Sequence, residues 1–109
     1  MEPNDDQMLA TIKDAVEKNA IAVFMKGTPA MPMCGFSAAV VQILDRMKVP
    51  YVGINAIENP RFRHVLSAYS SWPTLPQVFV GGKLVGGCDI VRELSASGEL
   101  DRLVAEATR

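Results

Sequence analysis

An unbroken run of apolar residues extends from Ile21 to Met25. Successive side chains of a strand point to opposite faces, so an apolar run without alternation is typical of a strand that is covered on both faces. A loop with Gly27 and two prolines follows, and after it apolar residues recur at helical spacing: Phe36, Val40, Ile43, Leu44 and Met47. A short strand from Tyr51 to Ile54 comes after the break at Pro50. This order predicts a parallel strand–helix–strand unit with a right-handed crossover.

Helix signals precede and follow this unit. Asn4 or Asp5 can cap a helix before the first strand. Asn59 followed by Pro60 is typical of a helix start, because asparagine caps the free amides and proline suits the first helical position. An amphipathic segment with apolar residues at helical spacing ends the chain.

The strands Gln77–Val80 and Lys83–Gly86 flank Gly81-Gly82, which is typical of a two-residue hairpin turn. Asp89 is expected to cap a further helix. The sequence therefore predicts one domain, residues 1–109, of the α/β class. Its expected architecture is a thioredoxin-like fold with a central mixed four-stranded sheet flanked by helices on both faces.

Composition limits the partners and the compartment. Eleven Lys and Arg residues balance twelve Asp and Glu residues, with a formal net charge of −1. Nucleic acids and anionic membranes demand a concentrated positive field, so we expect neither as a partner. The acidic opening Met1–Asp6 resembles neither a secretory signal nor an Arg-rich transit peptide. Two cysteines are too few for a secreted disulfide scaffold. We expect a cytoplasmic protein or, alternatively, the processed form of a mitochondrial or plastid matrix protein.

Cys34 stands where the exit loop of the first strand meets a helix. The free amides and the dipole at a helix start stabilise negative charge, and Lys26 adds a positive charge, so we expect a lowered thiol pKa. Ser37 stands where the C-x-x-C motif has its second cysteine, so any turnover needs Cys88 or an outside thiol. The alternative is a buried apolar filler, but the flanking proline and glycine favour an exposed loop.

A lone thiolate can also hold soft metal, because thiolates are the usual ligands of iron–sulfur clusters. One cysteine supplies too few ligands, so a cluster would lie between subunits or use a small-molecule thiol. Met31 and Met33 place two thioethers beside Cys34, which also suits Cu(I), although such methionines more often form filler or a contact surface. His64 is expected on the exposed side of its helix and not as a metal ligand.

Cys34-Gly35-Phe36-Ser37 resembles the signature of the monothiol glutaredoxins, the single-domain C-G-F-S class. Further segments match the family in order: Met25–Pro29, Asn59-Pro60, Trp72–Gln77 and Gly86–Ile90. The resemblance implies a thioredoxin fold, bound glutathione, and a [2Fe-2S] cluster shared between two subunits that each give Cys34 and one glutathione. It also implies assembly, storage and delivery of iron–sulfur clusters to recipient apoproteins, often with BolA-type partners.

The resemblance further implies a glutathione site. Lys26 and Arg63 match positions that contact the glycine carboxylate. Leu75 precedes a proline that is usually cis in this fold, and its backbone would pair with the cysteinyl moiety. The amides of Cys88 and Asp89, with the Asp89 carboxylate, would hold the γ-glutamyl carboxylate and amine. Without the resemblance, Arg63 is interpreted as a solvated charge and Asp89 as a helix cap.

Two functions stay open at this point. The first is a glutathione-dependent [2Fe-2S] carrier that is a homodimer when loaded, and this is the function we expect. The second is a weak glutathione-dependent thiol-disulfide oxidoreductase, in which Cys34 attacks a glutathione mixed disulfide and a second glutathione resolves the intermediate. Ser37 removes only the dithiol route. A structural protein with an inert cysteine is poorly supported.

Overall fold

A computed structural model describes residues 3–109, so the first two residues of the acidic opening lie outside it. The elements follow one another along the chain as α1 (Asp5–Lys18), β1 (Ile21–Met25), α2 (Gly35–Met47), β2 (Val52–Asn55), α3 (Pro60–Ser70), β3 (Gln77–Val80), β4 (Lys83–Gly86), α4 (Cys88–Ser97) and α5 (Glu99–Ala107). The strand order in the sheet is β2-β1-β3-β4. β1 runs parallel to β2 and antiparallel to β3, and β4 runs antiparallel to β3. The predicted mixed four-stranded sheet is confirmed.

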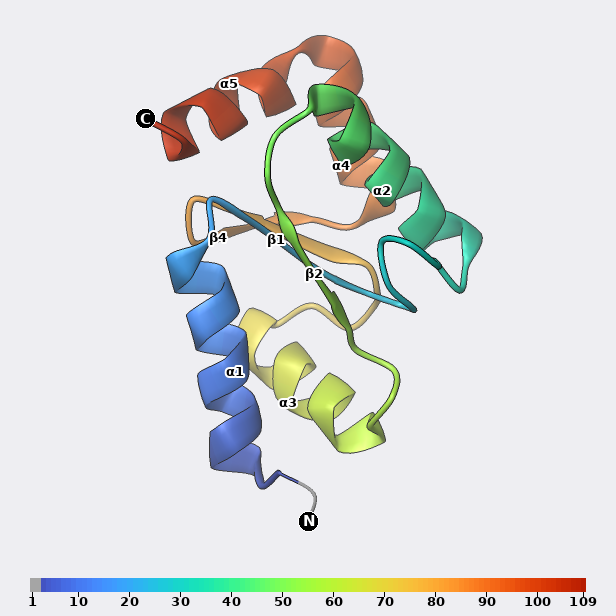
Figure 1. Ribbon diagram of the computed structural model, residues 1–109, viewed down its shortest axis with the longest axis vertical. Helices are drawn as coiled ribbons and strands as arrows, with labels where there is room; N and C mark the ends of the chain where they lie inside the picture. Colours follow the sequence, from blue (N-terminus) through green and yellow to red (C-terminus); the bar gives the residue numbers. More distant parts are fainter. Residues whose placement is uncertain (1–2) are drawn as a thin grey trace.

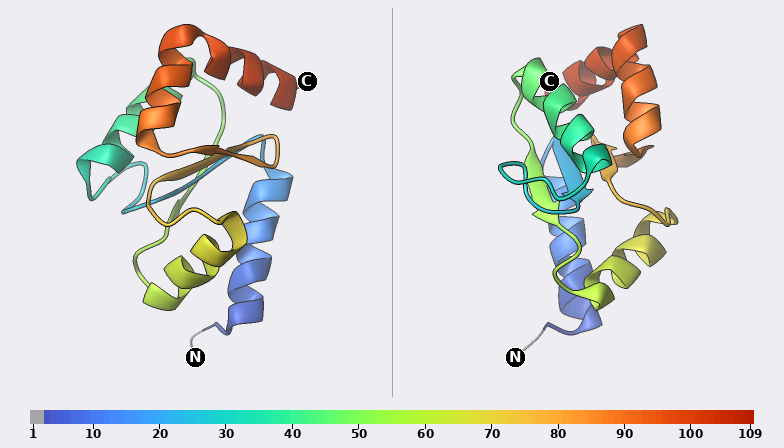
Figure 2. Two further views of the ribbon diagram at one scale, coloured as in Figure 1. Left: turned by 180° about the vertical axis from the view of Figure 1, so that it is seen from behind. Right: turned by 90° about the vertical axis from the view of Figure 1, so that its right-hand side faces the viewer.

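Helices cover both faces of this sheet, with α2, α4 and α5 on one side and α1 and α3 on the other (Figures 1 and 2). β1 is buried along its whole length. Ile21, Val23 and Met25 pack into the core beneath α2, α4 and α5, whereas Ala22 and Phe24 pack into the core beneath α1 and α3. The unbroken apolar run therefore serves two cores at once, because alternate side chains enter opposite layers.

Side chains cap the starts of α1, α2 and α3, whereas α4 and α5 begin after glycines and have no side-chain cap. Asn4 rather than Asp5 caps α1: its side chain accepts from the Gln7 N–H, and the Gln7 side chain accepts from the Asn4 N–H. Asp89 does not cap α4, and that prediction is wrong. The extended residue before the helix is Gly87, so helical backbone already begins at Cys88 and Asp89 lies inside the first turn.

The hairpin between β3 and β4 turns at Gly81 and Gly82, as predicted. Their φ values of +61° and +82° lie in the left-handed region, which two-residue hairpin turns need and glycine adopts at little cost. Within residues 3–109, no helix is both long enough and apolar enough to cross a membrane.

Candidate functional site

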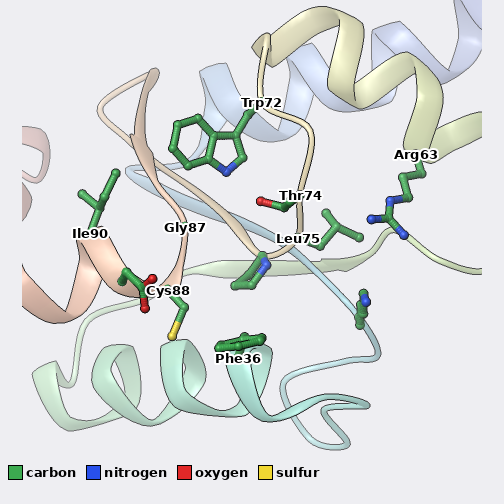
Figure 3. Close-up of a pocket in the computed structure, with 11 residues that line it drawn as sticks. Phe36, Arg63, Trp72, Thr74, Leu75, Gly87, Cys88 and Ile90 are labelled. Atoms are coloured by element: carbon green, nitrogen blue, oxygen red, sulfur yellow. The ribbon is translucent and has the colours of Figure 1, made fainter.

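A cleft of about 520 Å³ opens where the end of β1, the first turns of α3 and α4, and the loop before β3 meet (Figure 3). Its lining residues come from distant parts of the chain: Lys26, Phe36, Arg63, Trp72, Thr74, Leu75, Pro76, Gly87, Cys88, Asp89 and Ile90. Five of the six predicted site residues line this one cleft. The sixth, Cys34, is at the head of α2, the helix whose Phe36 lines the cleft.

Polar and charged lining residues stand at the ends of regular elements. Lys26 directly follows β1, and Arg63 lies in the first turn of α3. The start of α3 is determined by Asn59, whose side chain accepts from a first-turn N–H, and by proline at the first helical position. Cys88 and Asp89 open α4. The fold therefore brings polar groups from separate segments to one edge of the molecule.

The loop between α3 and β3 forms one wall of the cleft. The Leu75–Pro76 peptide bond is cis, as expected for this position. Leu75 is buried and Thr74 is exposed. Trp72 is half-buried, and its indole nitrogen points towards the cleft in Figure 3. This Nε1 atom is buried and has no hydrogen-bond partner within the described part of the chain, so it is a donor that a ligand or a water molecule can satisfy.

Cys34 is the N-cap residue of α2, and its sulfur accepts a hydrogen bond from the Ser37 N–H at 3.3 Å. The Ser37 hydroxyl oxygen also lies 3.3 Å from the Cys34 sulfur. That oxygen accepts from the Lys26 N–H at 3.1 Å, and Ser37 is fully buried. Once the thiol ionises, the hydroxyl is the donor to the sulfur. The serine that replaces a second cysteine therefore connects the thiol to the loop after β1.

Opposing effects determine the acidity of Cys34. Partial desolvation acts to raise the pKa of the thiol, but hydrogen bonds from the Ser37 hydroxyl and from the Ser37 and Phe36 N–H groups outweigh it, helped by the charge of Lys26. The net result is a pKa below the ordinary value, as predicted for a thiol at a helix start. Cys34 is partly exposed, so the thiolate is accessible as a nucleophile or a metal ligand.

Cys88 has the opposite character. Burial raises the pKa of this thiol; Arg92 opposes that effect, while Asp89 and Cys34 add to it. Only 6% of the residue is exposed, and its sulfur points towards α2 in Figure 3. Both cysteines are free. The protein therefore has one thiol of lowered pKa and one of raised pKa, although both are close to the cleft.

The charges in the cleft are available to a ligand. Lys26, Arg63 and Asp89 belong to no ion pair among residues 3–109, where the ion pairs join Lys18 with Asp14, Arg61 with Asp5, and Arg102 with Glu99 and Glu106. Arg63 lies at one end of the cleft, and the first turn of α4 lies at the other (Figure 3). The free N–H groups of that turn also favour an anion. Two cations, one carboxylate and a helix start suit a ligand that carries carboxylates and an amine.

Phe36 lies outside the core. It begins the apolar stripe of α2, yet it is 59% exposed and lines the cleft, whereas Ser37 in the same turn is fully buried. Met31 and Met33 are also exposed, at 73% and 64%. These three residues form an exposed apolar rim around Cys34, which agrees with a contact surface. His64 is exposed, as predicted.

Residue-by-residue reasoning missed part of the cleft lining. Trp72, Thr74, Gly87 and Ile90 also line the cleft, although no local pattern singles them out as binding residues. The signal was present in the sequence, because these residues lie in the matched segments Trp72–Gln77 and Gly86–Ile90. No group of three or more His, Cys, Asp or Glu side chains suitable for a metal ion occurs in residues 3–109.

The chain as a whole is similar to several known proteins. The Glutaredoxin family model matches residues 21–85. Probable monothiol glutaredoxin 2 from Rickettsia typhi is 44% identical over 105 residues, covering 96% of this chain and 95% of the relative. The solution structure of reduced poplar apo GrxS14 is 43% identical, with a TM-score of 0.85 over 94% of both chains. The crystal structure of a buckwheat glutaredoxin–glutathione complex is 27% identical, with a TM-score of 0.83 over 97% of both chains.

These structural neighbours confirm the thioredoxin-like fold, and the family match covers more than half of the chain. Cys34 with Ser37 three residues later has the one-cysteine pattern that the class name describes. The chain therefore belongs to the monothiol class of the glutaredoxin family.

Proposed function

We propose that this protein binds glutathione in the cleft and, as a homodimer, carries a [2Fe-2S] cluster for delivery to recipient apoproteins, together with BolA-type partners. The observation that carries the proposal is the single acidic thiol of Cys34 at the head of α2, beside a cleft with unpaired charges of both signs. We place the protein in a reducing compartment, cytoplasmic or matrix, where glutathione is plentiful.

Each part of glutathione has a counterpart in the cleft. Lys26 and Arg63 are the cations for the glycine carboxylate. The first turn of α4 suits the γ-glutamyl carboxylate, and Asp89 suits the γ-glutamyl amine. Leu75 offers its backbone to the cysteinyl moiety. The volume of about 520 Å³ lies within the ordinary range for small-molecule sites, and a buckwheat relative was crystallised as a glutathione complex.

The number of thiolates that one chain can supply explains why a cluster would need both glutathione and a second subunit. A [2Fe-2S] cluster takes four thiolate ligands. Each chain offers one readily ionised thiol, Cys34, whereas burial keeps Cys88 protonated. Two copies of Cys34 with two glutathione thiolates complete the set of four. The exposed rim of Met31, Met33 and Phe36 supplies apolar surface next to that site.

Reconstitution tests the carrier. The protein is incubated anaerobically with iron, sulfide and glutathione, and visible absorption, circular dichroism and size are measured on the same sample. We expect a glutathione-dependent chromophore on a dimer, absent from Cys34→Ser and largely retained in Cys88→Ser. A colourless monomer would contradict the carrier function. Equal loss of the cluster in both variants would overturn the ligand assignment.

One observation favours a second activity, because a partly exposed thiol of lowered pKa is also a nucleophile. The Cys34 thiolate would attack the glutathione sulfur of a protein–glutathione disulfide, and the protein thiolate would leave. A second glutathione thiolate would then attack the bound glutathione sulfur, releasing oxidised glutathione and regenerating Cys34. Cys88 takes no part, because its thiol stays protonated. A deglutathionylation assay with Cys34→Ser as the blank measures this activity.

A further inference from the structure

Gln77 is a fully buried polar residue that has no part in the proposed ligand contacts or thiol chemistry. It is the first residue of β3 and pairs with Phe24 of β1, and its exposed fraction is 0%. Its amide nitrogen donates to the Trp72 carbonyl at 2.9 Å and to the Thr74 carbonyl at 3.3 Å. Both carbonyls belong to loop 72–76, which forms a wall of the cleft. A side chain of the core therefore contacts the backbone of the binding loop directly.

These two bonds determine how the amide is oriented. Carbonyl oxygens only accept, so the nitrogen end of Gln77 must face the loop. The other end of the amide, Oε1, is then buried and has no partner in the described part of the chain. Burying an acceptor without a partner carries a desolvation cost that an apolar side chain would avoid. The benefit of an amide at this position is therefore its hydrogen bonding to the loop rather than a contribution to the stability of the core.

Leu75 anchors this loop in the core beneath α1 and α3, but few other hydrogen bonds restrain its backbone. The Trp72 N–H donates to the Ser70 hydroxyl at 3.2 Å, near the end of α3. On the far side, Gly87 packs so closely that a Cβ atom there would lie 3.3 Å from the Pro76 carbonyl oxygen. Loop 72–76 is thus held between the start of α4 and the amide of Gln77. Its position relative to α4 sets the width of the cleft.

We propose that Gln77 is a positioning residue, which holds loop 72–76 at the spacing from α4 that bound glutathione needs. This inference rests on the proposed glutathione binding. Gln77 is not among the residues that line the cleft, so it acts through the carbonyls of Trp72 and Thr74. Its loss weakens glutathione binding and raises KM for a glutathionylated substrate, while kcat and the reactivity of the Cys34 thiol are preserved.

The substitution Gln77→Met tests this role, because methionine fills a similar volume and donates no hydrogen bond. Trp72 is the only tryptophan, so quenching of its fluorescence by acrylamide reports on the loop without any ligand. We expect a higher quenching constant and a roughly tenfold higher glutathione dissociation constant by calorimetry. The alkylation rate of Cys34 should stay as in the wild type. Gln42→Met, at an exposed position of α2, is the matched control and should change none of these quantities.

The outcomes separate the two proposals. If the wild type does not bind glutathione, the proposed function fails, and the quenching comparison still decides whether Gln77 holds the loop. Unchanged quenching in Gln77→Met overturns the positioning role. So does unchanged glutathione affinity in a variant whose quenching has increased. A merely structural role would instead lower the unfolding midpoint and alter Cys34 alkylation. If Gln77→Met does not fold, Gln77→Leu also removes the donor without burying a charge and is subjected to the same measurements.

Discussion

The hydroxyl of Ser37 is expected to set the reactivity of Cys34, and Ser37→Ala removes it with little change in volume. The hydroxyl lies 3.3 Å from the sulfur and is the donor once the thiol has ionised. A hydrogen bond to a charged group contributes about 1.5 to 3 kcal/mol, and the distance to sulfur places this one near the lower limit. Its loss corresponds to a roughly tenfold smaller thiolate fraction at a fixed pH below the pKa.

The alkylation rate falls by less than the thiolate fraction. A thiolate of higher pKa is a better nucleophile, with a Brønsted coefficient of about 0.4 to 0.5, which recovers roughly threefold. We therefore expect Ser37→Ala to react about three to four times more slowly with iodoacetamide at neutral pH, and its rate profile to move to higher pH. The measurement is made in a Cys88→Ser background, so that one thiol is observed.

Ser67→Ala is the control for this experiment, because Ser67 lies on α3 away from the thiol. An unchanged rate profile for Ser37→Ala would refute the assignment of the hydroxyl as a thiolate donor and leave the backbone N–H groups and Lys26 as the causes of the lowered pKa. A second consequence is structural. The Lys26 N–H loses its acceptor, so the variant is also expected to lose about 1 to 3 kcal/mol of unfolding free energy.

Four further predictions follow from the packing and the charges. Leu66→Ala, at a fully buried position of α3, should lower the unfolding free energy by about 2 to 5 kcal/mol in chemical denaturation; a smaller loss would mean that the core closes around the gap. Gly87→Ala should weaken glutathione binding in calorimetry, because the added methyl group meets loop 72–76, and equal affinity would show that the loop yields freely. Burial and the Asp45 carboxylate raise the pKa of Tyr51 to about 12, so Asp45→Asn should lower that pKa in an ultraviolet titration, and an unchanged titration would contradict the assignment. Because the pKa of Cys88 is raised in the folded protein, this thiol ionises at a lower pH in the unfolded chain. The reduced wild-type protein should therefore lose unfolding free energy as the pH rises through the unfolded thiol pKa, and lose it more steeply than Cys88→Ser. Identical slopes of unfolding free energy against pH in the two proteins would contradict this prediction.

The direction of the pKa shift could be predicted from the sequence for one thiol and not for the other. The lowered pKa of Cys34 was predictable, because a helix start, a nearby lysine and a serine three residues later are all local features of the sequence. The raised pKa of Cys88 was not predictable. Cys88 also stands at a helix start, but burial dominates there, and burial depends on what α2 and loop 72–76 place around the sulfur.

Local patterns along the chain were enough to predict the strands, the hairpin turn and most helix starts, because each depends on neighbours within a few residues. The end of β1, the first turns of α3 and α4, and loop 72–76 meet only in the folded chain. The convergence of Lys26, Arg63 and Asp89 on one cleft was therefore expected only from the family resemblance. Tertiary packing alone decided the exposure of Phe36 and the start of α4 at Cys88. Phe36 is exposed because its helix turn faces the cleft, and α4 starts at Cys88 because extended backbone ends at Gly87, which no local capping side chain marks.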